Sequence, residues 1–336
     1  MRTKGAPPSS GMGRVRELGR KIPTPLKSPI LIAAMLAVAL IAVGEMVSPG
    51  FGSYPQIVQI LRVASFLGFI AVGQTIVILS GGAGIDLSVG KVATLAAIIA
   101  SRTMQGSDEN AFVGIALALL VAAGLGLVNG LGIVYLRITP FVMTLGMMGV
   151  AHGLILAYTR GVADGRAAPS LVGLVNGKLF LDLPGVVLLW VVMTVVVTLL
   201  LRRTKPGWDL YAVGTNRVAA ELSGVRVNRT VIGAYVASAL FAGLGGIFMV
   251  GYTQTVFLNL ADNLAMPSIA AVIIGGTLLS GGIGGYVGSA IGAVVLTVLT
   301  SLLTTLRMDE ASRTVVNGVV LIVLLAFYAR GRKLRS

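Results

Sequence analysis

The chain contains apolar runs that are too long for the core of a soluble domain. Residues 111–136 include no Asp, Glu, Lys or Arg, and about 20 apolar residues of helix are enough to cross the hydrocarbon core of a bilayer. Only 11% of the 336 residues are charged, whereas about a quarter are charged in a typical soluble domain. A chain with so few charges cannot cover its surface in water, and we predict a protein that lies in lipid.

The apolar runs do not alternate between apolar and polar positions, which excludes the strands of a membrane barrel. A helix satisfies its own backbone hydrogen bonds in lipid, so the sequence predicts an all-α polytopic membrane protein with about ten transmembrane helices, some of them broken by glycine. The ten segments, with soft boundaries, are 28–47, 61–80, 87–101, 111–136, 141–158, 184–202, 230–252, 266–281, 285–306 and 311–329.

Lys and Arg residues concentrate before the first predicted span, between the sixth and seventh, and after the last. Ten spans place these three segments on one side, which the positive-inside rule identifies as cytoplasmic. We therefore expect both termini in the cytoplasm. The predicted organisation is a basic segment at 1–27, a transmembrane domain at 28–329 with a cytoplasmic segment at about 203–229, and a basic tail at 330–336. The first apolar run is longer than the core of a cleaved signal peptide, so we expect it to remain as a helix.

The residues between the second and third spans are rich in glycine, which releases a helix, and Asp86 or Ser88 could cap the next one. Short segments broken by glycine often border the substrate path of a transporter. An ordinary turn with an N-cap is the alternative interpretation, and Asn129 could equally be a polar contact between helices. The candidate path residues are Gly81, Gly82, Gly84, Asp86, Ser88, Gly90, Asn129 and Thr144.

A second glycine cluster at 279–284 repeats the pattern Leu-Ser-Gly-Gly-x-Gly of 79–84. Two copies of one fold could explain this match, and so could chance in a glycine-rich chain. Small residues that recur every four positions predict faces where helix backbones pack closely. These positions are Gly126 and Gly130; Ala234, Ser238, Ala242 and Gly246; and Gly284, Gly288 and Gly292.

The chain lacks the residues for several kinds of chemistry. It has no cysteine, which excludes disulfides and thiolate chemistry, and we predict no metal site. Residues 84–92 resemble a phosphate-binding loop, but the spacing is one residue too long and Val92 has no hydroxyl for magnesium. The predicted spans hold almost no ionisable groups, which argues against a proton-coupled transporter and a voltage-gated channel. We therefore predict that the chain is not an enzyme and that any ATP is hydrolysed by another polypeptide.

The segment between the sixth and seventh spans contains a predicted short helix over 217–222. Asn216 can cap it, Ala219 and Ala220 would present a flat face, and Gly224 can end it. A helix this short is unstable alone in water, so we expect it to dock onto a partner. A solvated loop held by its two flanking spans is the alternative.

Four stretches together resemble the ribose-type (monosaccharide) permeases of bacterial ABC sugar importers, over about residues 55–328: Gly-Ile-Asp-Leu-Ser-Val-Gly at 84–90, Thr-Pro-Phe-Val-Met-Thr-Leu-Gly at 139–146, Asn-x-x-Ala-Ala-x-x-Ser-Gly at 216–224, and the glycine-rich stretch 275–292. The resemblance implies a protein of the bacterial inner membrane that pairs with a second permease subunit, identical or related. It also implies two cytoplasmic ABC ATPase subunits and a periplasmic or extracellular sugar-binding protein, with no nucleic-acid partner. This chain would bind no cofactor, because ATP and magnesium would sit on the ATPase.

The same resemblance identifies the short helix as the coupling helix that contacts the ATPase. Its family pattern falls on Val218, Ala219, Ala220 and Gly224, with Val218 in place of the expected Glu. Any ion pair made by that Glu is therefore absent here or supplied by Arg217 or Glu221. The predicted coupling residues are Asn216, Arg217, Val218, Ala219, Ala220, Glu221, Ser223 and Gly224.

These observations predict a permease subunit that moves a small neutral sugar or polyol by alternating access, driven by separate ATPases. An uncharged polar path suits such a solute, because a carboxylate would be met by Arg, Lys or helix N-termini. The motifs are not specific for one sugar. The alternatives are a related permease for branched-chain amino acids or nucleosides, an ATP-independent channel or facilitator, and a structural or signalling membrane protein.

Overall fold

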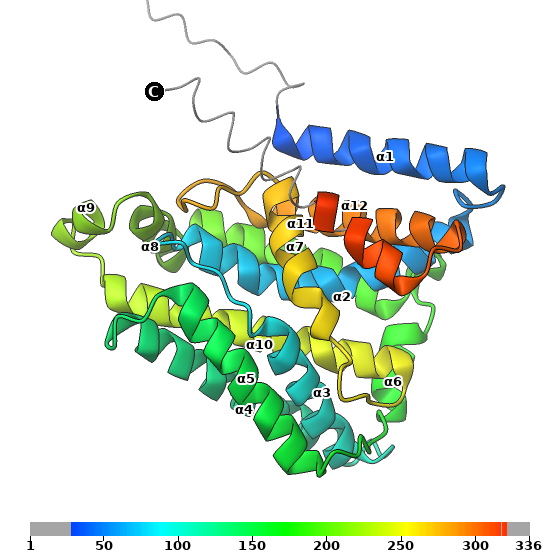
Figure 1. Cartoon of the computed structure of the whole chain (residues 1–336), viewed down its shortest axis with the longest axis horizontal. Coiled ribbons are helices and arrows are strands. Elements are labelled where there is room, and N and C mark those ends of the chain that lie inside the picture. The colour runs from blue at the N-terminus through cyan, green and yellow to red at the C-terminus, as the bar shows by residue number, and fades with distance from the viewer. Residues whose placement is uncertain (1–27, 317, 321–336) are drawn as a thin grey trace, which may run out of the picture.

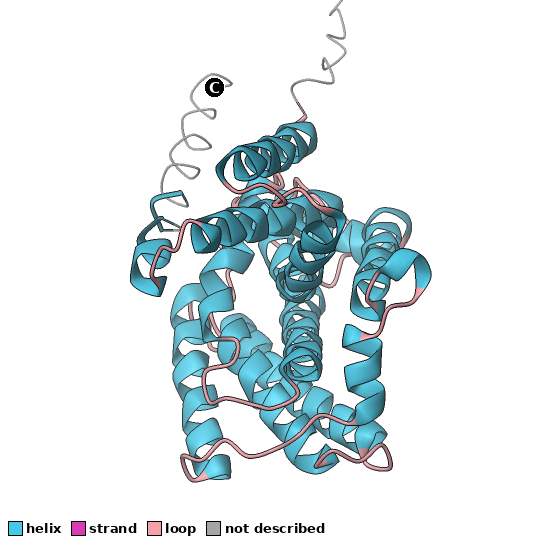
Figure 2. Cartoon of the chain, turned by 90° about the vertical axis from the view of Figure 1, so that its right-hand side faces the viewer, coloured by secondary structure: helices cyan, strands magenta, loops and turns pink. Residues whose placement is uncertain are grey.

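A computed structural model describes residues 28–316 and 318–320. The predicted basic segments 1–27 and 330–336 lie outside these residues. The described part contains α-helices, two short 3-10 helices and no strand beyond two isolated bridges, which confirms the all-α prediction (Figure 2). The helices are α1 (Pro29–Val47), α2 (Tyr54–Leu79), α3 (Val89–Met104), α4 (Ala111–Val134), α5 (Pro140–Thr159), α6 (Pro169–Asn176), η2 (Phe180–Asp182), α7 (Gly185–Arg203), α8 (Lys205–Thr215), α9 (Arg217–Leu222), α10 (Val227–Thr253), η3 (Asp262–Leu264), α11 (Ala265–Ile274) and α12 (Tyr286–Thr305).

Seven of the described helices are long and apolar enough to cross a membrane. Two other predicted spans form short helices: α3, predicted over 87–101, has 16 residues, and α11, predicted over 266–281, has 10. The predicted span 266–281 is wrong in its second half: the chain leaves the helix after Ile274, since Gly276 adopts a positive φ of +88°. In the tenth predicted span, 311–329, residues 311–316 and 318–320 are helical, and the rest lie outside the described residues.

The second helix begins at Tyr54 rather than at the predicted residue 61. Its first turns carry Gln56 and Gln59, which a purely apolar criterion excludes from a span. Gln59 has a partner inside the bundle, since its Nε2 donates to the Tyr252 hydroxyl at 2.8 Å. The Arg62 guanidinium lies over the ring of the same tyrosine, 5.9 Å from its centroid. Interhelical partners therefore lengthen α2 beyond its apolar run.

Helix α10 lies in the centre of the bundle and packs against α2, α3 and α4 (Figure 1). The predicted small-residue faces lie at these contacts. A Cβ on Gly246 would lie 2.0 Å from the Ala93 carbonyl oxygen, and one on Gly126 would lie 2.6 Å from that of Tyr235. Gly288 and Gly292 make equally close approaches to α11. These predictions are confirmed, except that Gly284 lies in the loop before α12.

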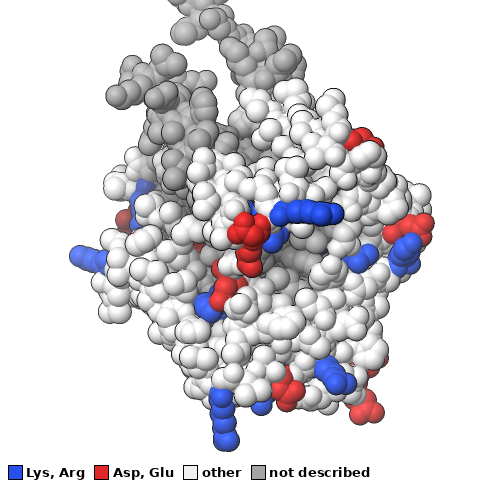
Figure 3. Space-filling view, turned by 45° about the vertical axis from the view of Figure 1, so that its right-hand side comes forward, with Lys and Arg blue, Asp and Glu red and all other residues white. Residues whose placement is uncertain are grey.

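The outer helices expose apolar side chains. Leu120 of α4 is 70% exposed and Val192 of α7 is 58% exposed, and most of the surface seen in Figure 3 is uncharged, with acidic and basic side chains gathered in a few groups. Such a surface is suited to lipid.

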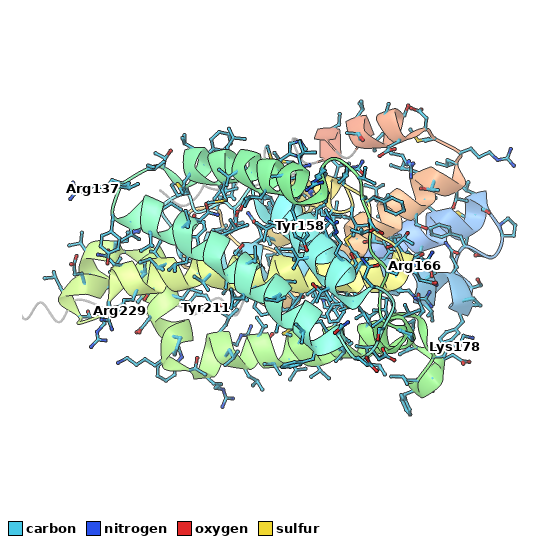
Figure 4. All side chains as sticks on the ribbon, turned by 90° about the horizontal axis from the view of Figure 1, so that it is seen from below. Arg137, Tyr158, Arg166, Lys178, Tyr211 and Arg229 are labelled. Carbon is cyan, nitrogen blue, oxygen red and sulfur yellow. The ribbon has the colours of Figure 1, made fainter. Side chains whose placement is uncertain are left out.

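Basic side chains at the two ends of the bundle follow the predicted arrangement. Arg137 and Arg229 lie at the end that carries α8 and α9, whereas Arg166 and Lys178 lie at the opposite end (Figure 4). The start of α1 is also at the first end, because Pro29 shares a pocket with Arg202. We call these the α9 end and the α6 end.

Candidate translocation and coupling sites

The break between α2 and α3 places a fully buried carboxylate inside the bundle. Asp86 Oδ1 accepts hydrogen bonds from the Ser88 backbone N–H at 3.0 Å and from the Ser88 hydroxyl at 2.6 Å. Its Oδ2 accepts from the Ser238 hydroxyl of α10 at 2.8 Å. The predicted helix break is confirmed, and the side chain that holds the start of α3 is Asp86, since the Ser88 side chain makes no cap bond.

Two further candidate path residues join this network from other helices. Asn129 Nδ2 of α4 donates to Ser88 Oγ at 3.1 Å. The Thr144 hydroxyl of α5 lies 3.3 Å from the Ile85 carbonyl oxygen. Three separate helices, α4, α5 and α10, are therefore tied to the stretch before α3. We call Ile85, Asp86, Ser88, Asn129, Thr144 and Ser238 the Asp86 network.

The Asp86 network is closed to solvent in this conformation. Asp86, Ser88, Asn129, Thr144 and Ser238 are all fully buried. Of the glycines predicted to border a path, Gly82 alone is exposed. The network thus fixes the break by hydrogen bonds, as expected when non-helical backbone at membrane depth is enclosed by protein.

Some polar atoms beside this network have no partner among the described residues. They are Asn129 Oδ1 and the hydroxyl of Tyr235, which lies one turn before Ser238 on α10. Both amide atoms of Gln74 on α2 are also buried and unpartnered in that part of the chain. Buried polar groups are rarely left without a hydrogen bond, so this region has capacity for additional polar contacts.

The two predicted glycine clusters meet at the α9 end. Gly81 and Gly82 have φ angles of +73° and +65°, and Gly281 and Gly282 have φ angles of +84° and +72°. The Gly282 N–H donates to the Leu79 carbonyl oxygen at 3.1 Å. A Cβ on Gly281 would lie 2.4 Å from the Gly81 Cα. The matching sequences therefore form matching turns that pack on each other, and no side chain fits between them.

The short helix expected from the sequence forms as α9. The Asn216 side chain accepts a hydrogen bond from the Ala219 N–H at 3.1 Å. At the other end Gly224 has a φ of +82°, and the Val225 N–H donates to the Ala220 carbonyl oxygen at 3.0 Å. The predicted N-cap and glycine terminator are both confirmed.

The face that α9 presents differs from the expectation. Ala220 is buried within the chain, with only 4% of its surface exposed, so it cannot form the outer face together with Ala219. Val218 and Leu222 are instead 67% and 85% exposed. They are four residues apart and share one side of the helix. Ser223 is used locally, since its hydroxyl donates to the Ala219 carbonyl oxygen at 2.8 Å, and Glu221 is exposed.

Arg217 links α9 to the turn after α2. Its Nη2 lies 3.5 Å from the Gly81 carbonyl oxygen, and its guanidinium fills the space beside Gly82, where a Cβ would lie 2.4 Å from it. The two sites that the sequence treats separately, the glycine break and the coupling helix, are thus in contact.

Two other residues of this region were not predicted. Ser238 was identified only as a packing position, although a hydroxyl in a small-residue face is also a hydrogen-bond donor. Tyr211 of α8 donates to the Gly284 carbonyl oxygen at 2.9 Å, and burial raises the pKa of its hydroxyl. Helix α8 contains Gly207 and Gly214, which disfavour a helix, and its segment was not predicted as one.

The family described as "Branched-chain amino acid transport system / permease component" matches residues 56–325. Among curated proteins, the chain is 33% identical to the ribose import permease protein RbsC of Bacillus subtilis over 286 residues, which is 84% of this chain and 88% of the relative. It is 35% identical over 243 residues to the inner membrane ABC transporter permease protein YjfF of Escherichia coli, covering 70% and 72% of the two chains.

A third relative is the fructose import permease protein FruF of Bifidobacterium longum, 34% identical over 233 residues, with 68% of this chain and 64% of the relative covered. No solved structure matches the chain. The described residues include seven helices long and apolar enough to cross a membrane, and this chain is a multi-pass membrane protein that belongs to the ABC transporter permease family.

Proposed function

We propose that the chain is the membrane subunit of an ABC importer of a bacterial inner membrane, and that it carries a small neutral sugar such as a pentose, a hexose or a polyol. The names of its relatives, a ribose and a fructose import permease, support this substrate class. The observation that carries the coupling part of the proposal is the contact of Arg217 with the Gly81 carbonyl oxygen. It gives a motion of α9 a direct route to the broken segment before α3.

In this proposal a separate ATPase docks on α9, and the α9 end faces the cytoplasm. The exposed Val218 and Leu222 would fill an apolar groove on the ATPase. This agrees with the absence of the Glu that relatives are expected to carry at position 218. ATP and magnesium would be held by the ATPase, so the chain itself would need no cofactor. A second permease subunit and an external binding protein would complete the importer.

Movement of α9 would reach the solute path through the two packed glycine turns. The turn after α2 leads directly into the Asp86 network, which connects α3, α4, α5 and α10. Such tightly packed elements tend to switch between discrete arrangements rather than deform continuously. Ten crossings, with α3 and α11 among them, would leave both termini in the cytoplasm.

Uptake into vesicles tests the function. The chain, its ATPase and its binding protein would be reconstituted, and uptake of D-ribose, D-fructose and leucine measured with and without ATP. We expect uptake of a sugar only with ATP. Leucine uptake would instead favour the branched-chain amino acid function named in the family description. Accumulation of solute by the chain alone, without any ATPase, would contradict the proposal.

A Leu222→Asp variant tests the docking surface, with Ser223→Ala as its control on the same helix. The new charge should prevent the ATPase from copurifying, because it would have to be buried without a partner. Copurification equal to that of the unchanged chain would show that this face of α9 is not the docking surface.

A further inference from the structure

The first turn of α3 carries a charged side chain well inside the bundle. Lys91 is the one residue between Asp86 and Ile98 that is not buried, with 15% of its side chain exposed. Helix α3 crosses α10 where Ala93 and Ala96 meet Gly246 and Gly243. Because α10 has 27 residues and both glycines lie in its inner part, Lys91 is far from both ends of the bundle.

Lys91 forms an ion pair with a residue that lies far along the chain, directly before the second short helix, α11. Its Nζ lies 2.6 Å from Oδ2 of Asp262, in η3 directly before α11, and the Asp262 side chain is 27% exposed. The contact is anchored next to the pair, since the Ala261 N–H donates to Thr94 Oγ1 at 3.0 Å. The pair therefore joins the starts of the two short helices, α3 and α11.

A partly exposed ion pair at this depth is not suited to lipid. Elsewhere the exposed positions of long helices are apolar, as at Leu120 and Val192, and a charged side chain in the bilayer centre costs about 2.5–3.5 kcal/mol or more. Two exposed side chains of the same segment, Asn259 and Asn263, are polar, although Phe257 and Met266 in it are exposed as well. Asn263 Nδ2 donates to Glu310 Oε1 at 3.3 Å. This surface must therefore face water or another polar surface.

The pair also has unused hydrogen-bonding capacity. Asp262 Oδ1 is buried and accepts no hydrogen bond from the described residues. A carboxylate accepts, an ammonium donates and an amide does both, so these groups together can satisfy the hydroxyls of a sugar. A solute with a carboxylate would be repelled by Asp262, and a solute with an ammonium group would be repelled by Lys91.

From these observations we propose that Lys91, Asn259, Asp262 and Asn263 form a polar patch that lines the solute path and holds sugar hydroxyls there. The sugar-holding part rests on the proposed function, whereas the hydration of the patch does not. The patch extends the candidate site beyond the Asp86 network, which is closed in this conformation, to Lys91, a charged position in the first turn of α3 that reaches the surface.

The absence of cysteine in the chain allows a direct test of hydration. Single cysteines would be introduced as Asn263→Cys, and as Lys91→Cys together with Asp262→Asn so that no unpaired charge remains. Leu120→Cys serves as an exposed apolar control and Ala239→Cys as a buried one. In membranes with the complete transporter, a charged, membrane-impermeant methanethiosulfonate reagent should label both patch cysteines at least tenfold faster than either control. Labelling no faster than Leu120→Cys would overturn the proposal.

Protection by solute tests the second part. In the complete transporter supplied with ATP, D-ribose or D-fructose should slow labelling of Asn263→Cys several-fold, while leucine should not. If the unchanged complex imports one of these sugars but neither sugar slows labelling, the sugar-holding role of the patch is wrong. If the complex imports neither sugar, the proposed function fails instead, and the labelling ratio still decides whether the patch lines a hydrated path.

Discussion

The glycine turns after α2 and after α11 begin alike but lead to different structures. Both place two consecutive glycines at positive φ, Gly81 with Gly82 and Gly281 with Gly282. After the first turn the chain stays non-helical until α3 begins at Val89, and it buries Asp86 in a hydrogen-bonded network. After the second turn it enters α12 within a few residues, at Tyr286.

The two turns also contact different helices of the α8–α9 segment. The first turn receives Arg217 of α9, the helix that we propose to bind the ATPase. The second receives the Tyr211 hydroxyl of α8 at Gly284. The repeated sequence therefore specifies a turn, and the residues after it decide whether the turn carries a polar network.

The largest effect should come from filling the contact between the two turns. In Gly281→Val, the left-handed φ costs about 1–2 kcal/mol, and the new Cβ would lie 2.4 Å from the Gly81 Cα. We expect the free energy of unfolding to fall by more than about 3 kcal/mol, because overpacking adds about 1–3 kcal/mol to the cost of the left-handed φ. Gly153→Val, with no atom within 4 Å of its Cβ, is the control. Equal melting temperatures of the two variants in detergent would show that the turns are not in contact.

The second-largest effect on stability should come from the hydrogen bonds made by the residues that follow each turn, and it should differ between the two turns. Asp86→Ala removes the acceptor of three buried hydrogen bonds. Each donor left unsatisfied costs about 1–3 kcal/mol. The matched change after the second turn is Thr277→Val, which removes one acceptor, for the Gly285 N–H at 3.3 Å. In denaturation experiments the free energy of unfolding should fall at least twice as much in Asp86→Ala as in Thr277→Val. Asp86→Asn should recover part of this loss. Equal losses in Asp86→Ala and Thr277→Val would remove the distinction between the turns.

A smaller effect on stability but a clear effect on transport is expected for Arg217→Ala. The side chain is exposed and its hydrogen bond is long, at 3.5 Å, so the stability should change by less than about 1 kcal/mol. ATP-driven uptake should fall several-fold, because α9 loses its contact with the first turn. Arg229→Ala at the same end is the control. Uptake equal to that of the control would contradict the coupling route through Arg217.

The smallest effect should come from the second turn. Tyr211→Phe removes one hydrogen bond to the Gly284 carbonyl oxygen, which is worth about 0.5–1.5 kcal/mol. We expect a slightly lower melting temperature and unchanged ATP-driven uptake. A several-fold loss of uptake would mean that both turns take part in coupling.

Local sequence signals predicted the features that depend on neighbouring residues. The glycines at 81–84 end α2, Asn216 and Gly224 bound α9, and small residues at every fourth position mark the faces around α10. Each of these follows from backbone sterics or from a hydrogen bond within a few residues, so one sequence is enough to predict it.

Features that depend on distant partners were missed or wrong. The start of α2 at Tyr54 requires Tyr252 to satisfy Gln59 and Arg62. The burial of Ala220 depends on how α9 folds back on the bundle. The pairing of Lys91 with Asp262 joins residues that are far apart in the chain, and no local pattern at either position indicates the other.

The sequence by itself determined that this chain is an all-α membrane protein with a break after α2 and a short capped helix at α9. Hydrophobicity and backbone conformation act over one or two turns, and a lipid environment leaves few alternatives to a helix. The tertiary structure alone decided that the two glycine turns touch, that Arg217 reaches the first of them, and that Asp86 and Asp262 find their partners. Hydrogen bonds and ion pairs require atoms within about 3 Å, and only the folded chain brings such distant residues together.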